Sequence, residues 1–318
     1  MANYPGGDPA PRCDQDLDSA IIALPAGAAT PPLGLLLDVD GPISSPISRT
    51  VAVPGLARDL TALANAGIPI AFNTGRSAEF LLAEVAPVLA AAGLDPAAPV
   101  WGIGEKGGIW FSFARPEELI IDRELALSQS LQDDLRGLVE NEFSELAFFD
   151  RTKHTMVSFE QHTHITNDRF QAERGRMDHA VATLLARHGL SYVWEGRPEL
   201  AGGPAGAAVI RIDPTIIATD IEHVGTGKDT GAHRFLTLLA ESGTPVPRVW
   251  RTMGDSRTDY AMATWLNEQG FSVAHVDVRP SDGIPAVPFA VLTHRDLIHD
   301  HAGAAFIAEW AKKLRSLA

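Results

Sequence analysis

The sequence predicts an α/β protein in which a doubly wound parallel sheet is interrupted by an inserted α+β domain. From Leu33 onward, short apolar runs alternate with helical stretches of 10–15 residues, the pattern of β–α–β units. The same alternation returns after Lys228. Between these halves, from about residue 107 to 220, helices fall between short strands, which favours an antiparallel sheet with helices on one face.

The length of 318 residues predicts two domains. Residues 33–106 and 221–318 are expected to form the α/β core, and residues 107–220 the insert. Residues 1–32 are rich in Ala, Pro, Gly and Asp and are expected to be a loose lead-in.

Each element follows from its apolar pattern. In the first half the expected strands are 33–38, 68–72 and 99–103, and the expected helices are 53–66 and 77–92. In the insert we expect a hairpin of 109–113 and 118–121, helices 128–143 and 168–188, and strands 146–149, 155–160, 192–194 and 208–212. After it we expect helices 228–239, 258–266 and 302–317, and strands 248–253, 271–275 and 289–292.

The composition points to a small ligand. The formal net charge of −14, from 26 basic and 40 acidic residues, argues against a nucleic-acid or anionic-membrane surface. The single cysteine, Cys13, suits a reducing cytosol. No apolar run approaches the ~20 residues needed to cross a bilayer, and the N-terminus lacks the features of a signal peptide. A cytoplasmic protein is expected, with its oligomeric state open.

The most informative stretch is Asp38-Val39-Asp40-Gly41, at the end of the first apolar strand. Residues two apart in a strand point to one face, so both carboxylates can project past its carboxyl edge, where ligands bind in open α/β sheets. Paired carboxylates there can hold a hard cation or divide nucleophile and acid/base roles. The alternative is a solvated acidic loop, since four residues make a weak motif.

Two glycine-containing turns could hold a phosphate. Asn73-Thr74-Gly75-Arg76 ends the second strand, where a hydroxyl and main-chain N–H groups meet a helix start; the alternative is an ordinary N-cap turn. Gly225-Thr226-Gly227-Lys228 precedes a helix, and the ammonium of Lys228 could neutralise carboxylates or a transferring phosphoryl group. The alternative there is a solvated lysine.

A second pair of acids follows the strand at 248–253. In Gly254-Asp255-Ser256-Arg257-Thr258-Asp259, two carboxylates four residues apart around a turn could supply a metal ligand and an acceptor that orients it. A helix N-cap with a charged first turn is the alternative. Four such signals at four ends of one predicted sheet edge, however, favour one functional site.

These four motifs, in this order, resemble those of the haloacid dehalogenase superfamily of phosphohydrolases: DxDG, then Ser/Thr, then Lys, then GDxxxD. The resemblance covers about Leu33 to the C-terminus and implies a Rossmann-like core. It implies that Asp38 attacks phosphorus and that Asp40 serves as acid and base. The implied cofactor is Mg²⁺, held by Asp38, the Asp40 carbonyl and Asp255 with Asp259 in support, while Thr74, Gly75 and Lys228 would hold the phosphoryl oxygens.

The insert resembles the cap of the Cof-type branch, which is similar to sugar-phosphate and trehalose-phosphate phosphatases and to phosphomannomutases. Glu105-Lys106-Gly107-Gly108 resembles that branch's Glu-Asn-Gly-Ala turn, with Lys106 in place of asparagine, which leaves its role toward substrate open. Lys153 and His154 precede a cap strand and resemble a segment that contacts sugar hydroxyls; a surface turn is the alternative.

The function implied is therefore a magnesium-dependent phosphatase that acts on a small phosphorylated metabolite, with a sugar phosphate as the favoured substrate class. A phosphomutase would keep the same acids. A non-catalytic binding protein of the same fold is the alternative from another class, but it would not need both Asp38 and Asp40.

Overall fold

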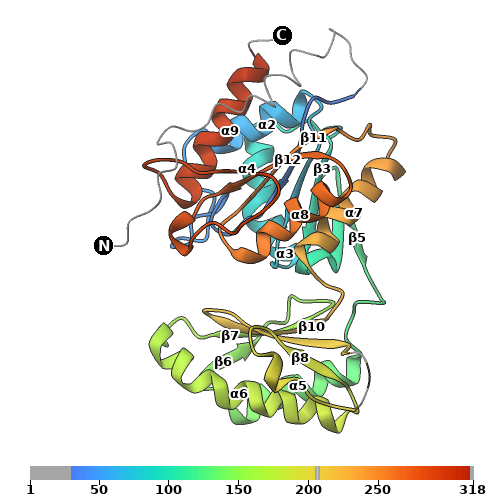
Figure 1. Ribbon diagram of the computed structural model, residues 1–318, viewed down its shortest axis with the longest axis vertical. Coiled ribbons are helices and arrows are strands. Elements are labelled where there is room, and N and C mark those ends of the chain that lie inside the picture. Colours follow the sequence, from blue (N-terminus) through green and yellow to red (C-terminus); the bar gives the residue numbers. More distant parts are fainter. Residues whose placement is uncertain (1–29, 205, 207, 316–318) are drawn as a thin grey trace. The chain divides into compact units, whose positions relative to one another are not determined.

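The computed structural model describes residues 30–204, 206 and 208–315, so most of the expected lead-in lies outside the described residues. The chain divides into two compact units (Figure 1). One comprises the described residues up to Leu119 and those from Gly227 on, and the other is Ile120–Thr226.

The larger unit contains an eight-stranded sheet with the order β13-β12-β11-β1-β2-β3-β4-β5. Its six parallel strands are β1 (Gly34–Leu37), β2 (Ile70–Asn73), β3 (Val100–Gly104), β11 (Val249–Gly254), β12 (Ser272–Asp277) and β13 (Ala290–Leu292). All six correspond to strands predicted from apolar runs. Because they are parallel, the segments that follow their carboxyl ends lie at one edge of the sheet.

Helices cover both faces of this sheet, which explains why its strands are continuously apolar. On one face pack α2 (Leu56–Asn65), α4 (Ala86–Ala91) and α9 (His299–Arg315), and on the other α7 (Lys228–Glu241) and α8 (Tyr260–Glu268) (Figure 1). Side chains of β1 alternate between them: Leu35 and Leu37 join the first hydrophobic cluster and Leu36 the second.

The helix predicted at 77–92 is interrupted. Ser77 caps α3 (Ala78–Phe80) by accepting a hydrogen bond from the Phe80 N–H, and a π-helical turn at Leu81–Val85 then connects α3 to α4. Pro87 lies in the first turn of α4. Proline has no N–H to donate, which explains why the regular α-helical ladder does not continue through this point.

The hairpin predicted at the start of the insert extends the larger sheet instead. Strand β4 (Ile109–Ser112) pairs antiparallel with β3, and β5 (Arg115–Ile121) lies next to β4 at the sheet edge. Ile109 and Phe111 point into the core of the larger unit. Burial of these side chains explains why the chain turns back to the sheet before it enters the second unit.

The second unit is a five-stranded sheet with helices on one face, as its pattern predicts (Figure 1). The order is β6 (Ala147–Phe149), β7 (Val157–Gln161), β10 (Ala218–His223), β9 (Ile210–Pro214) and β8 (Tyr192–Trp194). Pairing is antiparallel except between β8 and β9. The helices are α5 (Gln129–Glu142), capped by Ser128, and α6 (Asn167–Arg187), capped by Thr166.

Strand β10 is absent from the sequence predictions, although it is the central strand of this sheet. Only Ala218 and Ile221 are apolar in this strand, and the polar side chains of Thr219, Asp220 and Glu222 are buried. Their hydrogen-bond partners lie on other elements. The Thr219 hydroxyl donates to Asp178 at 2.6 Å, and Glu222 accepts from Arg211 Nε at 2.8 Å. The larger unit resumes at Gly227 and not at the expected residue 221, because β10 continues to His223 within the second sheet.

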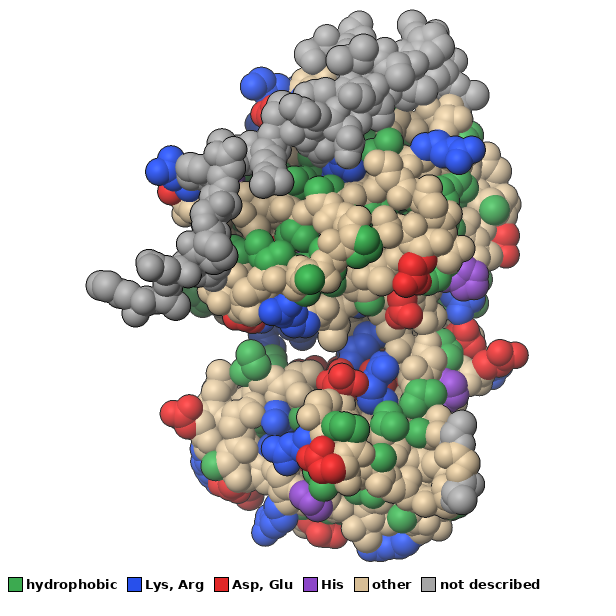
Figure 2. Space-filling view, in the orientation of Figure 1, with side chains coloured by type: hydrophobic (Ala, Val, Ile, Leu, Met, Phe, Trp, Pro, Cys, Tyr) green, Lys and Arg blue, Asp and Glu red, His purple; other side chains and the backbone are tan. Residues whose placement is uncertain are grey.

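Charged side chains of both signs are interspersed over the face drawn in Figure 2, as far as described residues form it. None of the described helices combines the length and apolarity needed to cross a membrane.

Candidate active site

The candidate site lies at the carboxyl edge of the larger sheet, where three neighbouring parallel strands end. Asp38 follows β1, Thr74 follows β2 and Asp255 follows β11. The Asp38 N–H donates to the Met253 carbonyl of β11 at 2.8 Å, which continues the pairing of the strands up to the site. This is the edge predicted from the positions of the motifs.

Lys228 is the centre of the site. Its Nζ lies 2.6 Å from Asp38 Oδ1 and 2.7 Å from Asp259 Oδ1, and it donates to the Asn73 carbonyl at 2.8 Å. In return, Asn73 Nδ2 donates to the Lys228 carbonyl at 2.8 Å, which holds the first residue of α7 against β2. The structure therefore brings together residues 38, 228 and 259, which the motifs predict to belong to one site.

Burial and charge pairing set the protonation of this cluster. Burial, together with the charge of Asp259, raises the pKa of Asp38 well above its usual range, although Lys228 opposes the shift. Burial also opposes ionisation of Asp259, but the ammonium of Lys228 outweighs it and lowers the pKa of that carboxyl. The pKa of Lys228 is raised because its two carboxylate partners overcome the cost of burial. The cluster thus keeps its lysine charged.

Asp259 is engaged at both carboxylate oxygens. Oδ2 accepts from the N–H of Asp255 at 3.1 Å, from the N–H of Ser256 at 2.9 Å and from the Ser256 hydroxyl at 2.7 Å, while Oδ1 faces Lys228. Ser256 and Asp259 form a reciprocal capping box at the turn before α8. Asp259 therefore fixes the loop that carries Asp255.

The acidic residues fit a hard cation. Carboxylate oxygens of Asp38, Asp255 and Asp259 lie within 4.8 Å of one another, and such oxygen donors suit Mg²⁺ or Ca²⁺. The loops approach closely: a Cβ at Gly41 would lie 2.8 Å from the Asp255 side chain, and one at Gly254 would lie 2.1 Å from that of Asp259. Burial and the nearby charge of Asp259 raise the pKa of Asp255 to about 6, as expected where carboxylates gather.

Asp40 is paired with an arginine, Arg76. Its two carboxylate oxygens accept hydrogen bonds from Nε and Nη2 of Arg76, at 2.8 and 2.9 Å. None of the sequence motifs predicts a role for Arg76, although this residue belongs to the turn Asn73-Thr74-Gly75-Arg76. The position of Arg76 could have indicated this role. It follows the end of one strand, next to the strand that Asp40 follows, and a guanidinium can bind both oxygens of a carboxylate.

The turn that carries Thr74 and Gly75 is tightly held. Thr74 is fully buried, and its hydroxyl accepts from the Arg76 N–H at 3.2 Å. Because Ser77 is the residue that caps α3, the Thr74 hydroxyl is not used as a helix cap. Lys106 lies beside this turn: a Cβ built at Gly75 would meet its Cε at 3.8 Å.

Lys153 and His154 belong to the second unit. They lie in the turn between β6 and β7, and both are partly buried.

Solved structures resemble the chain over nearly its whole length. The C-terminal domain of C. albicans trehalose-6-phosphate phosphatase matches with a TM-score of 0.66 and 14% identity, covering 97% of this chain and 99% of that chain. The chain has a haloacid dehalogenase-like fold. Trehalose-6-phosphate phosphatase from Aspergillus fumigatus matches with a TM-score of 0.51 and 15% identity, covering 95% of this chain and 99% of that one.

A haloacid dehalogenase-like hydrolase from Bacteroides thetaiotaomicron also matches, with a TM-score of 0.54 and 12% identity, covering 87% of this chain and 98% of that chain. No protein-family model and no curated protein matches the sequence. The predicted α/β class and the resemblance to haloacid dehalogenase-like phosphatases are thereby confirmed at the level of the fold. The chemistry rests on the residues of the site.

Proposed function

We propose that this protein is a magnesium-dependent phosphatase that hydrolyses a small phosphorylated metabolite of the cytoplasm, with a sugar phosphate as the substrate class. The observation that carries the proposal is the Lys228 ammonium held between the carboxylates of Asp38 and Asp259 at the sheet edge. Phosphoryl transfer depends on positioning and on charge stabilisation, and this cluster supplies both.

Asp38 is the proposed nucleophile. One of its carboxylate oxygens attacks phosphorus, the bond from phosphorus to the leaving oxygen breaks, and Asp40 gives its proton to that oxygen. In the second half, Asp40 takes a proton from water, the water oxygen attacks phosphorus, and the bond to Asp38 breaks to release inorganic phosphate. A single acid/base thus serves both halves of the reaction.

The remaining residues of the site bind and orient. Lys228, Thr74 and the main-chain N–H of Gly75 would hold the phosphoryl oxygens. Asp38, the Asp40 carbonyl and Asp255 would hold Mg²⁺, and Asp259 would orient Asp255, since its own oxygens are already engaged. When bound, Mg²⁺ neutralises charge on the phosphoryl group.

The second unit is proposed to select the substrate. Its candidate substrate contacts are Lys153 and His154, and Lys106 is a further candidate from the larger unit. The names of the matched trehalose-6-phosphate phosphatases support a phosphorylated sugar as the first class of compounds to test.

The test is phosphate release from a panel of phosphorylated metabolites with Mg²⁺, comparing wild type with Asp38→Asn. We expect turnover of at least one sugar phosphate and a loss of at least about 10³-fold in the variant. Asp296→Asn, at a carboxylate with 78% of its side chain exposed, is the matched control and should keep full activity.

Two outcomes would redirect the proposal. A wild-type protein that binds phosphorylated sugars but turns none over, with no effect of Asp38→Asn, would indicate a binding protein. Interconversion of a hexose 1-phosphate and its 6-phosphate that requires a bisphosphate primer would indicate a phosphomutase.

A further inference from the structure

The turn Glu105–Gly107 has an unusual backbone. Three consecutive residues adopt positive φ angles: 49° at Glu105, 54° at Lys106 and 94° at Gly107. Glycine adopts this region freely, whereas residues with a Cβ do so at a cost. Among the described residues other than glycine, only Arg49, Glu105, Lys106 and His299 have a positive φ angle. Such conformations persist where surrounding contacts determine them.

The main chain of the turn connects two loops of the candidate site. The Glu105 N–H donates to the Arg76 carbonyl and the Lys106 N–H to the Thr74 carbonyl, both at 2.9 Å. The Lys106 carbonyl accepts from the Gly227 N–H at 2.8 Å, immediately before Lys228. The turn is therefore bonded to the Thr74 loop on one side and to the start of α7 on the other.

Gly107 allows close contact with α7. A Cβ built there would lie 2.9 Å from the Gly231 N and 3.0 Å from Cγ2 of Thr230, so a side chain would push the first turn of the helix away. The neighbouring Glu105 is fully buried, which anchors the turn in the unit. The backbone of this turn thus defines how closely the helix that begins at Lys228 approaches the loop of Thr74.

We propose that Glu105-Lys106-Gly107 is a brace that sets the distance between Thr74 and Lys228, so that Lys106 and Gly107 are positioning residues for phosphoryl binding. The inference rests on the proposed function, which assigns the phosphoryl oxygens to Thr74 and Lys228. A misplacement of about 1 Å in such a site can cost about 10²-fold in rate. The brace acts through its backbone, so the ammonium of Lys106 is not required for it.

Two variants separate backbone from charge. Lys106→Asn removes the ammonium but keeps a residue that tolerates positive φ, whereas Lys106→Val introduces a β-branched residue that opposes it. We expect Lys106→Asn to retain more of the kcat for p-nitrophenyl phosphate, and more of the inhibition by vanadate, than Lys106→Val does. We expect Lys106→Val to weaken both by at least about tenfold. Equal losses in the two variants would overturn the brace in favour of a charge role.

A glycine pair distinguishes positioning from general stability. Gly107→Ala and Gly67→Ala both place a Cβ at a positive φ, 94° and 87°, but the Cβ at Gly67 has no neighbour within 4 Å. We expect both to lower the melting temperature, and only Gly107→Ala to reduce vanadate affinity, by at least about tenfold. Equal vanadate affinity in the two folded variants would overturn the proposal.

Hydrogen exchange tests the brace without catalysis. The Gly227 amide should exchange at least about tenfold faster in Lys106→Val than in Lys106→Asn, because its acceptor is the Lys106 carbonyl. Equal exchange of that amide in the two variants would overturn the brace, whether or not the wild type is active. An inactive wild type would contradict the proposed function alone. If Lys106→Val or Gly107→Ala does not fold, Lys106→Ser serves as the milder variant in the same exchange measurement.

Discussion

Arg76 and Asp40 form a two-bonded ion pair, with Nε donating to Oδ2 at 2.8 Å and Nη2 donating to Oδ1 at 2.9 Å. The guanidinium also lies 4.6 Å from the centre of the Phe80 ring. One planar group thus engages both oxygens of the carboxylate that we propose as acid and base. Such a geometry fixes the orientation of a carboxylate more strictly than a point charge can.

Replacing Arg76 with lysine should therefore impair proton transfer. Lysine keeps the charge but cannot form the fork, so we expect kcat for an alkyl phosphate to fall by at least about tenfold. The fall should be smaller for p-nitrophenyl phosphate, whose leaving group departs without a proton. Arg115→Lys, at an exposed pair with Glu118, is the control. Equal losses for both substrates would argue against a role of Arg76 in proton transfer.

Removing Lys228 should destabilise the folded protein. Lys228→Met leaves the buried carboxylates of Asp38 and Asp259 without their cation, and breaking a buried ion pair costs about 3–5 kcal/mol. Urea unfolding at pH 7 with a chelator measures this loss, which should shrink at lower pH as the carboxyls take up protons. Lys312→Met removes an exposed lysine and should change stability by less than about 0.5 kcal/mol. A Lys228→Met protein as stable as wild type at pH 7 would contradict the prediction.

His275 should make stability depend on pH. Burial lowers its pKa to about 4, and its Nδ1 lies 2.7 Å from the Thr252 hydroxyl. Between pH 4 and about 6.5, His275 is protonated in the unfolded chain but neutral in the folded chain. Its contribution to the free energy of unfolding is therefore complete above pH 6.5 and is lost as the pH falls toward 4. The shift corresponds to roughly 3 kcal/mol.

Unfolding free energies of wild type and His275→Gln, measured between pH 4 and 7, check this. We expect a flatter pH dependence in the variant, while His301→Gln, at an exposed histidine on α9, is the matched control. Parallel curves for wild type and His275→Gln would show that the histidine is not the source.

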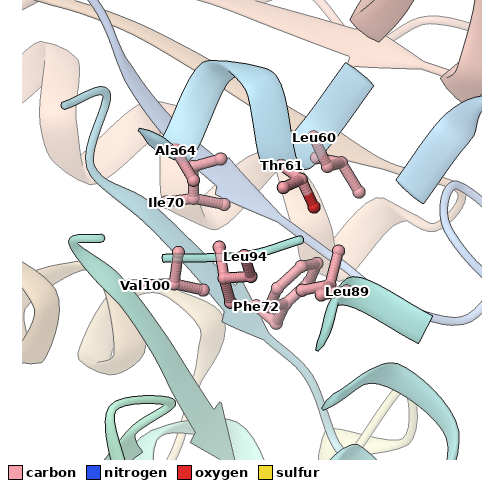
Figure 3. A pocket seen from close by; sticks show the side chains of 8 residues that line it. All are labelled: Leu60, Thr61, Ala64, Ile70, Phe72, Leu89, Leu94 and Val100. Atoms are coloured by element: carbon pink, nitrogen blue, oxygen red, sulfur yellow. The ribbon is translucent and has the colours of Figure 1, made fainter. Parts of the chain in front are cut away.

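Thr61→Val should stabilise the larger unit. The Thr61 hydroxyl is buried without a hydrogen-bond partner, in a space under α2 lined by apolar side chains such as Ile70, Phe72 and Leu89 (Figure 3). Replacing an unpaired hydroxyl with a methyl group of similar shape should add about 1 kcal/mol. Thr237→Val removes a hydroxyl that donates to the His233 carbonyl at 3.1 Å, and it should bring no gain. Thermal unfolding of both variants decides, and a destabilised Thr61→Val would contradict the assignment.

Local sequence patterns are enough to predict the parallel strands and the positions of the acids. Apolar runs such as Gly34–Leu37 are buried on both faces, so local composition is enough to identify them. Because Asp38 and Asp255 directly follow such strands, their shared edge followed from the topology. The same reasoning placed Lys228 at the start of a helix, where the structure has it.

Features that depend on partners far away in the sequence become visible in the folded protein alone. Strand β10 buries polar side chains against residues of β9 and α6, so no apolar pattern marks it. The pairing of β4 with β3, the fork between Arg76 and Asp40, and the left-handed turn at Lys106 likewise depend on contacts made after the chain has folded. The apolar pattern of a segment indicates which of its side chains are buried. Charge pairing and backbone strain depend instead on residues from other segments that contact it.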